Sequence, residues 1–234
     1  MLWTNNYGKL DIYDIALTNS GEIIGVATLF DPIKGFYFKM DKDGKLLWAR
    51  ATEDFSSFNL SSVETTEDGG MIAILAIGGF GNKNLILLKI NANGGFGWAK
   101  SIKNINVLHA KMIKTGTDNY TIMGNSRFGI EEPPLLSFYI NFDATGNITS
   151  QRFGFGDKYF YPIVFNNFVA IDDQLILTSV KYDGCDVEEF RLSAINNSDK
   201  KSLWHKKLSN LKQPYVFNDN FPTRSTSQDT PTVG

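Results

Sequence analysis

Residues 36–50 read FYFKMDKDGKLLWAR, and residues 87–100 read LLKINANGGFGWAK. Each stretch starts with apolar residues, passes through Asp-Gly or Asn-Gly, and ends in Trp-Ala followed by a basic residue. Asp-Gly and Asn-Gly tolerate the positive φ that a two-residue hairpin turn requires. Each stretch therefore predicts two antiparallel strands joined by a tight turn, and the two stretches are copies of one unit.

Two weaker copies follow along the chain. Residues 141–152 keep the Thr145-Gly146 turn but carry Ser150 in place of Trp, and residues 193–206 keep Trp204 but lack the Gly turn. An earlier hairpin precedes every copy, and a repeat of about 50 residues with four short strands is typical of a β-propeller blade. We therefore expect an all-β fold, a β-propeller with four recognisable four-stranded blades. The propeller would be either closed and four-bladed or an arc of a larger propeller.

The strand pattern assigns residues 1–217 to the propeller. We expect a surplus strand at 1–8, blades at 9–52, 59–102, 108–154 and 163–208, and an extra strand at 212–217. Residues 218–234 are rich in Thr, Ser, Asp and Pro and predict a polar C-terminal tail or linker. Surplus strands leave edges with unpaired backbone groups, which recruit other strands. The expected partners are therefore other protein chains, in a homo- or hetero-oligomeric assembly.

Composition excludes several classes of protein. The chain has 23 basic and 25 acidic residues, so the basic footprint of a nucleic-acid binder is missing. No apolar run approaches the length of a membrane helix, and we expect no membrane insertion. The first residues show no secretory signal, which leaves a cytoplasmic location open. Cys185 is the single cysteine, so the chain forms no internal disulfide.

The motif Lys-apolar-Asp/Asn-x-Asp/Asn-Gly-x-x-x-Trp-Ala-Lys/Arg is matched closely at residues 39–50 and 89–100. It resembles the propeller repeats common in secreted and surface proteins of bacteria and in some phage virion proteins. The resemblance implies the propeller fold, a habit of making contacts, and a place outside the cell, at its surface or in a virion. It implies no catalytic residue, because the motif consists of a turn, a packing Trp and a strand.

Candidate catalytic and metal-binding chemistry is sparse. Residues 124–129, GNSRFG, miss the spacing of a nucleophile elbow and are followed by no helix. The two histidines, His109 and His205, lie out of register with each other in the repeat. The Asp-x-Asp-Gly at 41–44 hints at a calcium loop, but hairpin-turn chemistry explains it without a metal. We expect no catalytic residue, no metal and no cofactor.

The sequence therefore predicts a non-enzymatic structural and binding module that mediates protein–protein contacts in a surface or virion assembly. Trp48, Trp98 and Trp204 are expected to be largely buried against the neighbouring blade. The first alternative is a carbohydrate-binding propeller that attaches to a surface glycan, and the second is a propeller hydrolase. Aromatic residues are favoured at contact sites, and the candidate binding residues in the connecting loops are Phe55, Phe58, His109, Tyr159 and Tyr161.

Overall fold

The chain folds into four antiparallel sheets of four strands each, as the sequence predicts. The computed structural model describes residues 10–30, 33–51, 58–77, 84–103, 105–127, 135–153, 163–172, 174–183, 186–196 and 202–207. In each sheet the strands follow one another in chain order, and every neighbouring pair is antiparallel. The described strands do not link the sheets into one closed sheet. The residues expected to form surplus strands at 1–8 and 212–217, and the tail at 218–234, lie outside the described part of the chain.

The strand bounds follow the repeat. The first sheet contains β1 (Leu10–Leu17), β2 (Ile23–Phe30), β3 (Ile33–Met40) and β4 (Leu46–Ala51). The second contains β5 (Phe58–Thr65), β6 (Met71–Ile77), β7 (Asn84–Ile90) and β8 (Phe96–Ile102). The third contains β9 (Asn106–Lys114), β10 (Asn119–Arg127), β11 (Leu135–Asp143) and β12 (Ile148–Phe153). The fourth contains β13 (Ile163–Ile171), β14 (Gln174–Asp183), β15 (Asp186–Asn196) and β16 (Ser202–Lys207).

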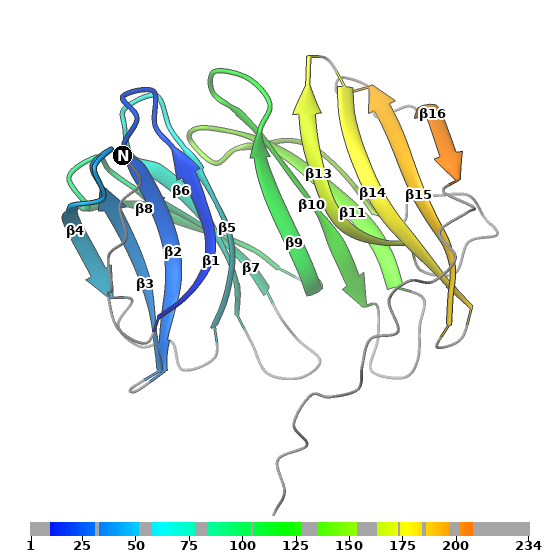
Figure 1. Ribbon diagram of the computed structural model, residues 1–234, viewed down its shortest axis with the longest axis horizontal. Coiled ribbons are helices and arrows are strands. Elements are labelled where there is room, and N and C mark those ends of the chain that lie inside the picture. Colours follow the sequence, from blue (N-terminus) through cyan, green and yellow to red (C-terminus); the bar gives the residue numbers. More distant parts are fainter. Residues whose placement is uncertain are drawn as a thin grey trace, which may run out of the picture.

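The sheets are arranged side by side, as propeller blades are. The first strands β1, β5 and β9 are neighbours along the inside of the arrangement, and β13 follows β9 (Figure 1). The last strands β4 and β16 lie at the outer left and right of the view, with the second and third sheets behind (Figure 1). The first sheet and the fourth sheet therefore form the two ends of an arc.

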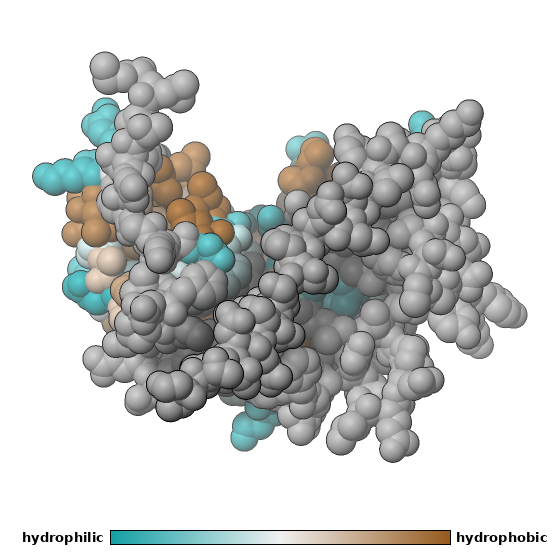
Figure 2. Space-filling model, turned by 60° about the horizontal axis from the view of Figure 1, so that its bottom comes forward, coloured by the Kyte–Doolittle hydropathy of each residue, from teal (hydrophilic) through white to brown (hydrophobic). Residues whose placement is uncertain are grey.

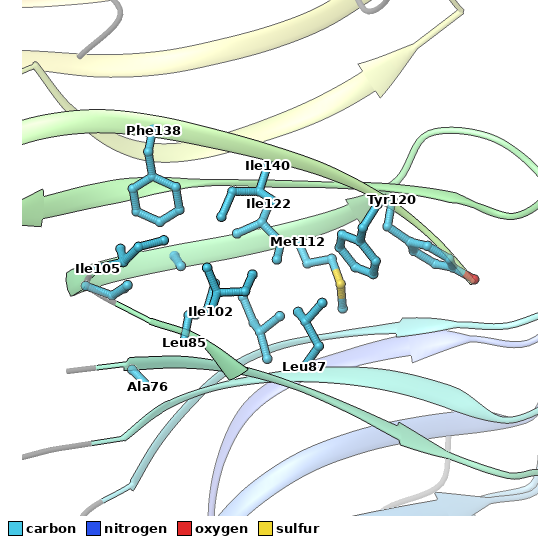
Figure 3. Close-up of a cluster of buried hydrophobic side chains, with 14 of the residues drawn as sticks. Ala76, Leu85, Leu87, Ile102, Ile105, Met112, Tyr120, Ile122, Phe138 and Ile140 are labelled. Atoms are coloured by element: carbon cyan, nitrogen blue, oxygen red, sulfur yellow. The ribbon is translucent and has the colours of Figure 1, made fainter. Parts of the chain in front are cut away.

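The hydrophobic core lies between consecutive sheets. Between the second and third sheets, Leu87 faces Met112 and Ile122, with Tyr120 and Phe138 from the third sheet completing the cluster (Figure 3). The Tyr120 hydroxyl donates a hydrogen bond of 3.0 Å to the Thr65 carbonyl of the second sheet, so the buried phenol is satisfied. A second cluster joins the first and second sheets, and a third joins the third and fourth sheets.

The Gly hairpins differ from the expected two-residue turns. In the first copy, the backbone N–H of Asp41 donates to the Lys45 carbonyl at 2.9 Å, so three residues form the loop. The Asp41 carboxylate accepts from the N–H groups of Asp43 and Lys45, both at 2.9 Å. Gly44 takes a φ of 78°, which suits a type I turn followed by a left-handed residue. The prediction of a Gly at positive φ is confirmed. The loop has three residues instead of two, and the Asp41 side chain caps the backbone N–H groups within it.

Each outer strand pairs with its neighbour through a bulge at the same place. The register shifts directly after Lys39, Lys89, Asn141 and Ala194, the residues opposite Trp48, Trp98, Ser150 and Trp204. The pairing of the third and fourth strands of each sheet therefore aligns all four copies, including the two whose motifs are weak. Because a bulge bends and twists a strand, it sets the direction in which each Trp position leaves its sheet.

Candidate functional site

The repeated Trp connects each of the first two sheets to the next one. Trp48 donates its indole N–H to the Ala92 carbonyl of the second sheet at 3.0 Å. Trp98 packs against the cluster between the second and third sheets. Most of the surface of both side chains is buried, as expected, and part of each ring stays accessible because it lies over a surface hairpin of the next sheet. The Trp204 side chain lies outside the described part.

Buried lysines opposite Trp48 and Trp98 lock the two hairpins of each sheet together. The Lys39 ammonium lies 2.7 Å from the Glu22 carboxylate and donates to the Gly69 carbonyl of the second sheet at 3.1 Å. The hydrogen bond from Lys39 is the largest cause of a pKa of Glu22 below its usual value. This lysine therefore serves both its own sheet and the contact with the next one.

Lys89 makes the corresponding contacts inside the second sheet. Its ammonium lies 2.8 Å from both carboxylate oxygens of Asp68 and 2.7 Å from the Thr66 hydroxyl. Partial burial pushes the pKa of Asp68 up, but hydrogen bonds from Lys89, Thr66 and the Gly70 N–H outweigh it and hold that pKa below its usual value. The ion pair is therefore a structural clamp, and every donor of the ammonium has an acceptor within reach.

The third sheet replaces this clamp with neutral groups. Asn141 occupies the lysine position, accepts from the Thr121 hydroxyl at 2.7 Å and donates to the Ser150 hydroxyl at 2.8 Å. The third copy thus replaces both the Lys and the Trp, and the pair is satisfied without a charge, whereas the fourth copy keeps Trp204 opposite Ala194. These polar groups in the first three sheets therefore contribute to holding each sheet together.

A polar seam joins the inner strands. The Asp14 carboxylate in β1 accepts from the Ser62 hydroxyl at 2.6 Å and from the Val63 N–H at 3.1 Å, both in β5. Glu64 follows on β5, and burial raises its pKa, helped by the negative charge of Asp14 and opposed by Lys111. The seam connects the first two sheets at the inside of the arc. Beside it, the Glu64 carboxyl is poorly solvated.

The predicted binding residues are only partly placed. Phe58 begins β5, and His109 lies within β9 with an exposed side chain. The stretch at 105–109 is therefore mostly strand where a loop was expected, and Ile105 and Val107 are buried in the core. Phe55, Tyr159 and Tyr161 lie outside the described residues, so the expected aromatic surface stays a prediction.

The exposed face of β1 is the surface that sequence reasoning missed. Ile12, Ile15 and Leu17 are 57%, 57% and 67% exposed on one strand. Isolated exposed apolar residues are ordinary, but a group of them on one sheet face indicates a contact surface. A signal was present in the sequence, because the positions equivalent to Ile15 in later copies are apolar. The sequence does not reveal that no described sheet lies in front of the first one.

Metal and membrane sites are not indicated in the described part of the chain. No group of three or more His, Cys, Asp or Glu among these residues comes close enough to hold a metal ion. Within the same ranges, no helix has the length and hydropathy needed to cross a bilayer.

Comparisons with known proteins give likenesses to solved structures and no sequence family. No protein-family model matches the chain, and no curated protein matches it. A solved structure with a similar fold is a subtype N10 neuraminidase-like protein of A/little yellow-shouldered bat/Guatemala/060/2010, at 9% identity and a TM-score of 0.49. The match covers 81% of this chain and 56% of that chain, so this chain spans little more than half of its neighbour.

This likeness corrects one prediction. We expected no enzyme, and the match to a neuraminidase-like protein contradicts that expectation. We therefore withdraw the exclusion of enzymatic activity. The identity and TM-score are too low to carry a reaction, a ligand or a residue role from that protein to this chain, so no activity is assigned in its place.

Proposed function

We propose that this chain is a propeller-type structural and binding module whose sheet faces contact other protein chains, in an assembly at a cell surface or in a virion. The arc of four sheets is, in this proposal, part of a propeller whose ends are completed by a neighbour. The observation that carries the proposal is the exposed apolar face of β1, formed by Ile12, Ile15 and Leu17. A surface of this kind loses its contact with water when a partner packs on it, which stabilises association.

The internal sheet contacts support the same view. Positions equivalent to Ile15 are buried wherever a preceding sheet is present, as at Val63 and Met112, which are both 1% exposed. The inner strand of the first sheet therefore follows the same pattern as the others, and no described sheet precedes it. The extracellular or virion setting comes from the resemblance of the repeat motif.

Hydrogen exchange on the isolated chain, combined with its sedimentation, tests this proposal. We expect either association or a monomer in which the outward-facing amides of β1 and β13 exchange quickly, because no described strand pairs with them. A compact monomer with those amides protected would mean that the ends are closed internally, and the contact role would lose its basis.

A further inference from the structure

Each of the two end sheets presents one broad face that no other described sheet covers. In the ladder register, Ile15 of β1 corresponds to Val63, Met112 and Phe168 in the later inner strands. Those three side chains are buried because each packs against the preceding sheet. No described sheet precedes Ile15, and it is exposed. On its inner strand the first sheet therefore shows apolar side chains to water, while Ala27, Phe38 and Met40 farther along the same face are buried.

The fourth sheet exposes the opposite kind of face. Val169 corresponds to Ala16, Glu64 and Ile113, which point toward the following sheet. Ile113 is buried against the fourth sheet, whereas Val169 is 50% exposed and Ile171 is 54% exposed. Among the described sheets, none follows the fourth, just as none precedes the first.

The internal contacts show that these two kinds of face fit each other. At the junction of the third and fourth sheets, Ile113 and Phe168 belong to one buried cluster. Ile113 holds the position of Val169 and Phe168 holds the position of Ile15, so Val169 and Ile15 are complementary by repeat. They do not meet within one chain, because the fourth sheet does not pack on the first as consecutive sheets do.

The arrangement of the ends favours a second copy as the occupant. The first and fourth sheets both turn a broad face toward the viewer, on opposite sides of the inner strands (Figure 1). In the turned view, a hollow separates apolar surface on the left from a smaller apolar area on the right (Figure 2). Two uncovered faces on the same side of an arc can both be covered by an identical arc rotated by a two-fold axis.

We propose that two copies of this chain pack as two arcs, with the fourth sheet of each copy against the first sheet of the other. This inference rests on the proposed function and names its partner. Two equivalent contacts form, each pairing Ile15 with Val169, and both apolar end faces leave water. The chain carries a net charge of −2, so charge repulsion between two copies is weak.

Site-directed cross-linking tests the pairing. In a Cys185→Ser background, Ile15→Cys and Val169→Cys are made singly and together, and each is treated with a short bis-maleimide. The double variant, and an equimolar mixture of the two single variants, should give a two-chain product. Neither single variant alone should do so. A cross-link within one chain, a ladder of longer products, or a two-chain product from one single variant alone would overturn the proposal.

Sedimentation of charged variants gives the second readout. Ile15→Asp and Val169→Asp should each sediment as one chain, while the wild type sediments as two. Phe96→Asp is the matched control, because Phe96 is 65% exposed on the second sheet, which has a neighbour on each side. Circular dichroism and unfolding curves confirm that each variant is folded.

The two proposals fail in different ways. A wild type that associates without the Ile15–Val169 cross-link overturns the paired arcs and leaves the contact role intact. A wild type that stays a monomer also overturns the paired arcs, and the exchange of the β1 and β13 amides then decides the contact role separately.

Discussion

Trp48 lies directly over Gly94. A Cβ placed on Gly94 would come within 2.9 Å of Cδ2 of the Trp48 ring, and the indole N–H is anchored on the Ala92 carbonyl. Trp98 stands in the same relationship to Gly146, where the Cβ would lie 2.6 Å from Cη2. In both cases the Trp belongs to one sheet and the Gly hairpin to the next. The two signature residues of the repeat are therefore the two halves of one contact.

Each of the two weak copies lacks one of the two residues that form this contact. The third copy carries Ser150 where Trp is expected, and the hairpin of the fourth copy, at residues 196–200, contains no Gly. Residues 197–200 lie outside the described part of the chain, so only the sequence shows that the loss of Trp in the third copy is followed by the loss of Gly in the fourth.

Replacing Gly94 with Ala should destabilise the chain more than the same change at Gly21. Both glycines have a positive φ, 81° and 80°, so both variants carry a backbone strain of about 1–2 kcal/mol. Only at Gly94 does the new methyl group also displace the Trp48 ring, since Gly21 faces nearly open space. Urea unfolding measures the difference. Equal free-energy losses at the two sites would show that the ring contact contributes nothing.

Replacing Trp98 with Ala should lower the free energy of unfolding by about 2–4 kcal/mol, because a large aromatic contact between two sheets is lost. The value falls toward the lower end of the range for Trp, since part of the ring stays accessible. Trp98→Phe is the control that keeps an aromatic ring and should cost less. A loss under about 1 kcal/mol for Ala would mean that the ring is a free surface.

Asp68→Asn should lower the free energy of unfolding at neutral pH by about 1 kcal/mol, a modest value because half of the Asp68 side chain is exposed. The pKa of Asp68 is lower in the folded chain than its usual value. Its contribution is therefore complete above the unfolded-state pKa and disappears as pH falls through the folded-state pKa. Unfolding curves of the variant and the wild type should converge in acid. Curves that stay parallel would contradict the ion pair.

Glu64→Gln should act in the opposite direction. The pKa of Glu64 is raised by burial and by the charge of Asp14, so its ionised form opposes folding once pH rises above the unfolded-state pKa. The variant removes this charge and keeps an acceptor for the backbone, so it should be more stable than the wild type at neutral pH. The advantage should shrink as pH falls. A less stable variant at neutral pH would indicate that the charge is well solvated or paired.

The sequence predicted the strands well because each carries a local signal. Asp43-Gly44 and Asn93-Gly94 mark hairpins whose strands the structure places within one sheet. The bulge after Lys39 has no local signal, and it became visible only when the ladder was known. The same is true of the clamp between Lys89 and Asp68, because the two residues lie on different hairpins of the repeat and meet only when the sheet forms.

The candidate contact surface was harder to predict. Apolar residues such as Ile15 and Val63 look the same in the sequence, although one is exposed and the other is buried. Their difference depends on the number of neighbouring sheets, which is a property of the whole arc. Reasoning from loops pointed instead to His109, which lies within β9. Repeats therefore predict which face of a sheet packs, and the three-dimensional arrangement decides whether a neighbour is present.

The most direct test is the mass of the wild-type chain in solution, measured by sedimentation over a series of concentrations. The uncovered faces at Ile15 and Val169 predict a reversible change from one chain to two chains as concentration rises. A single compact species of one chain at every concentration, with the amides of β1 and β13 protected from exchange, would contradict the proposal that these faces are contact surfaces.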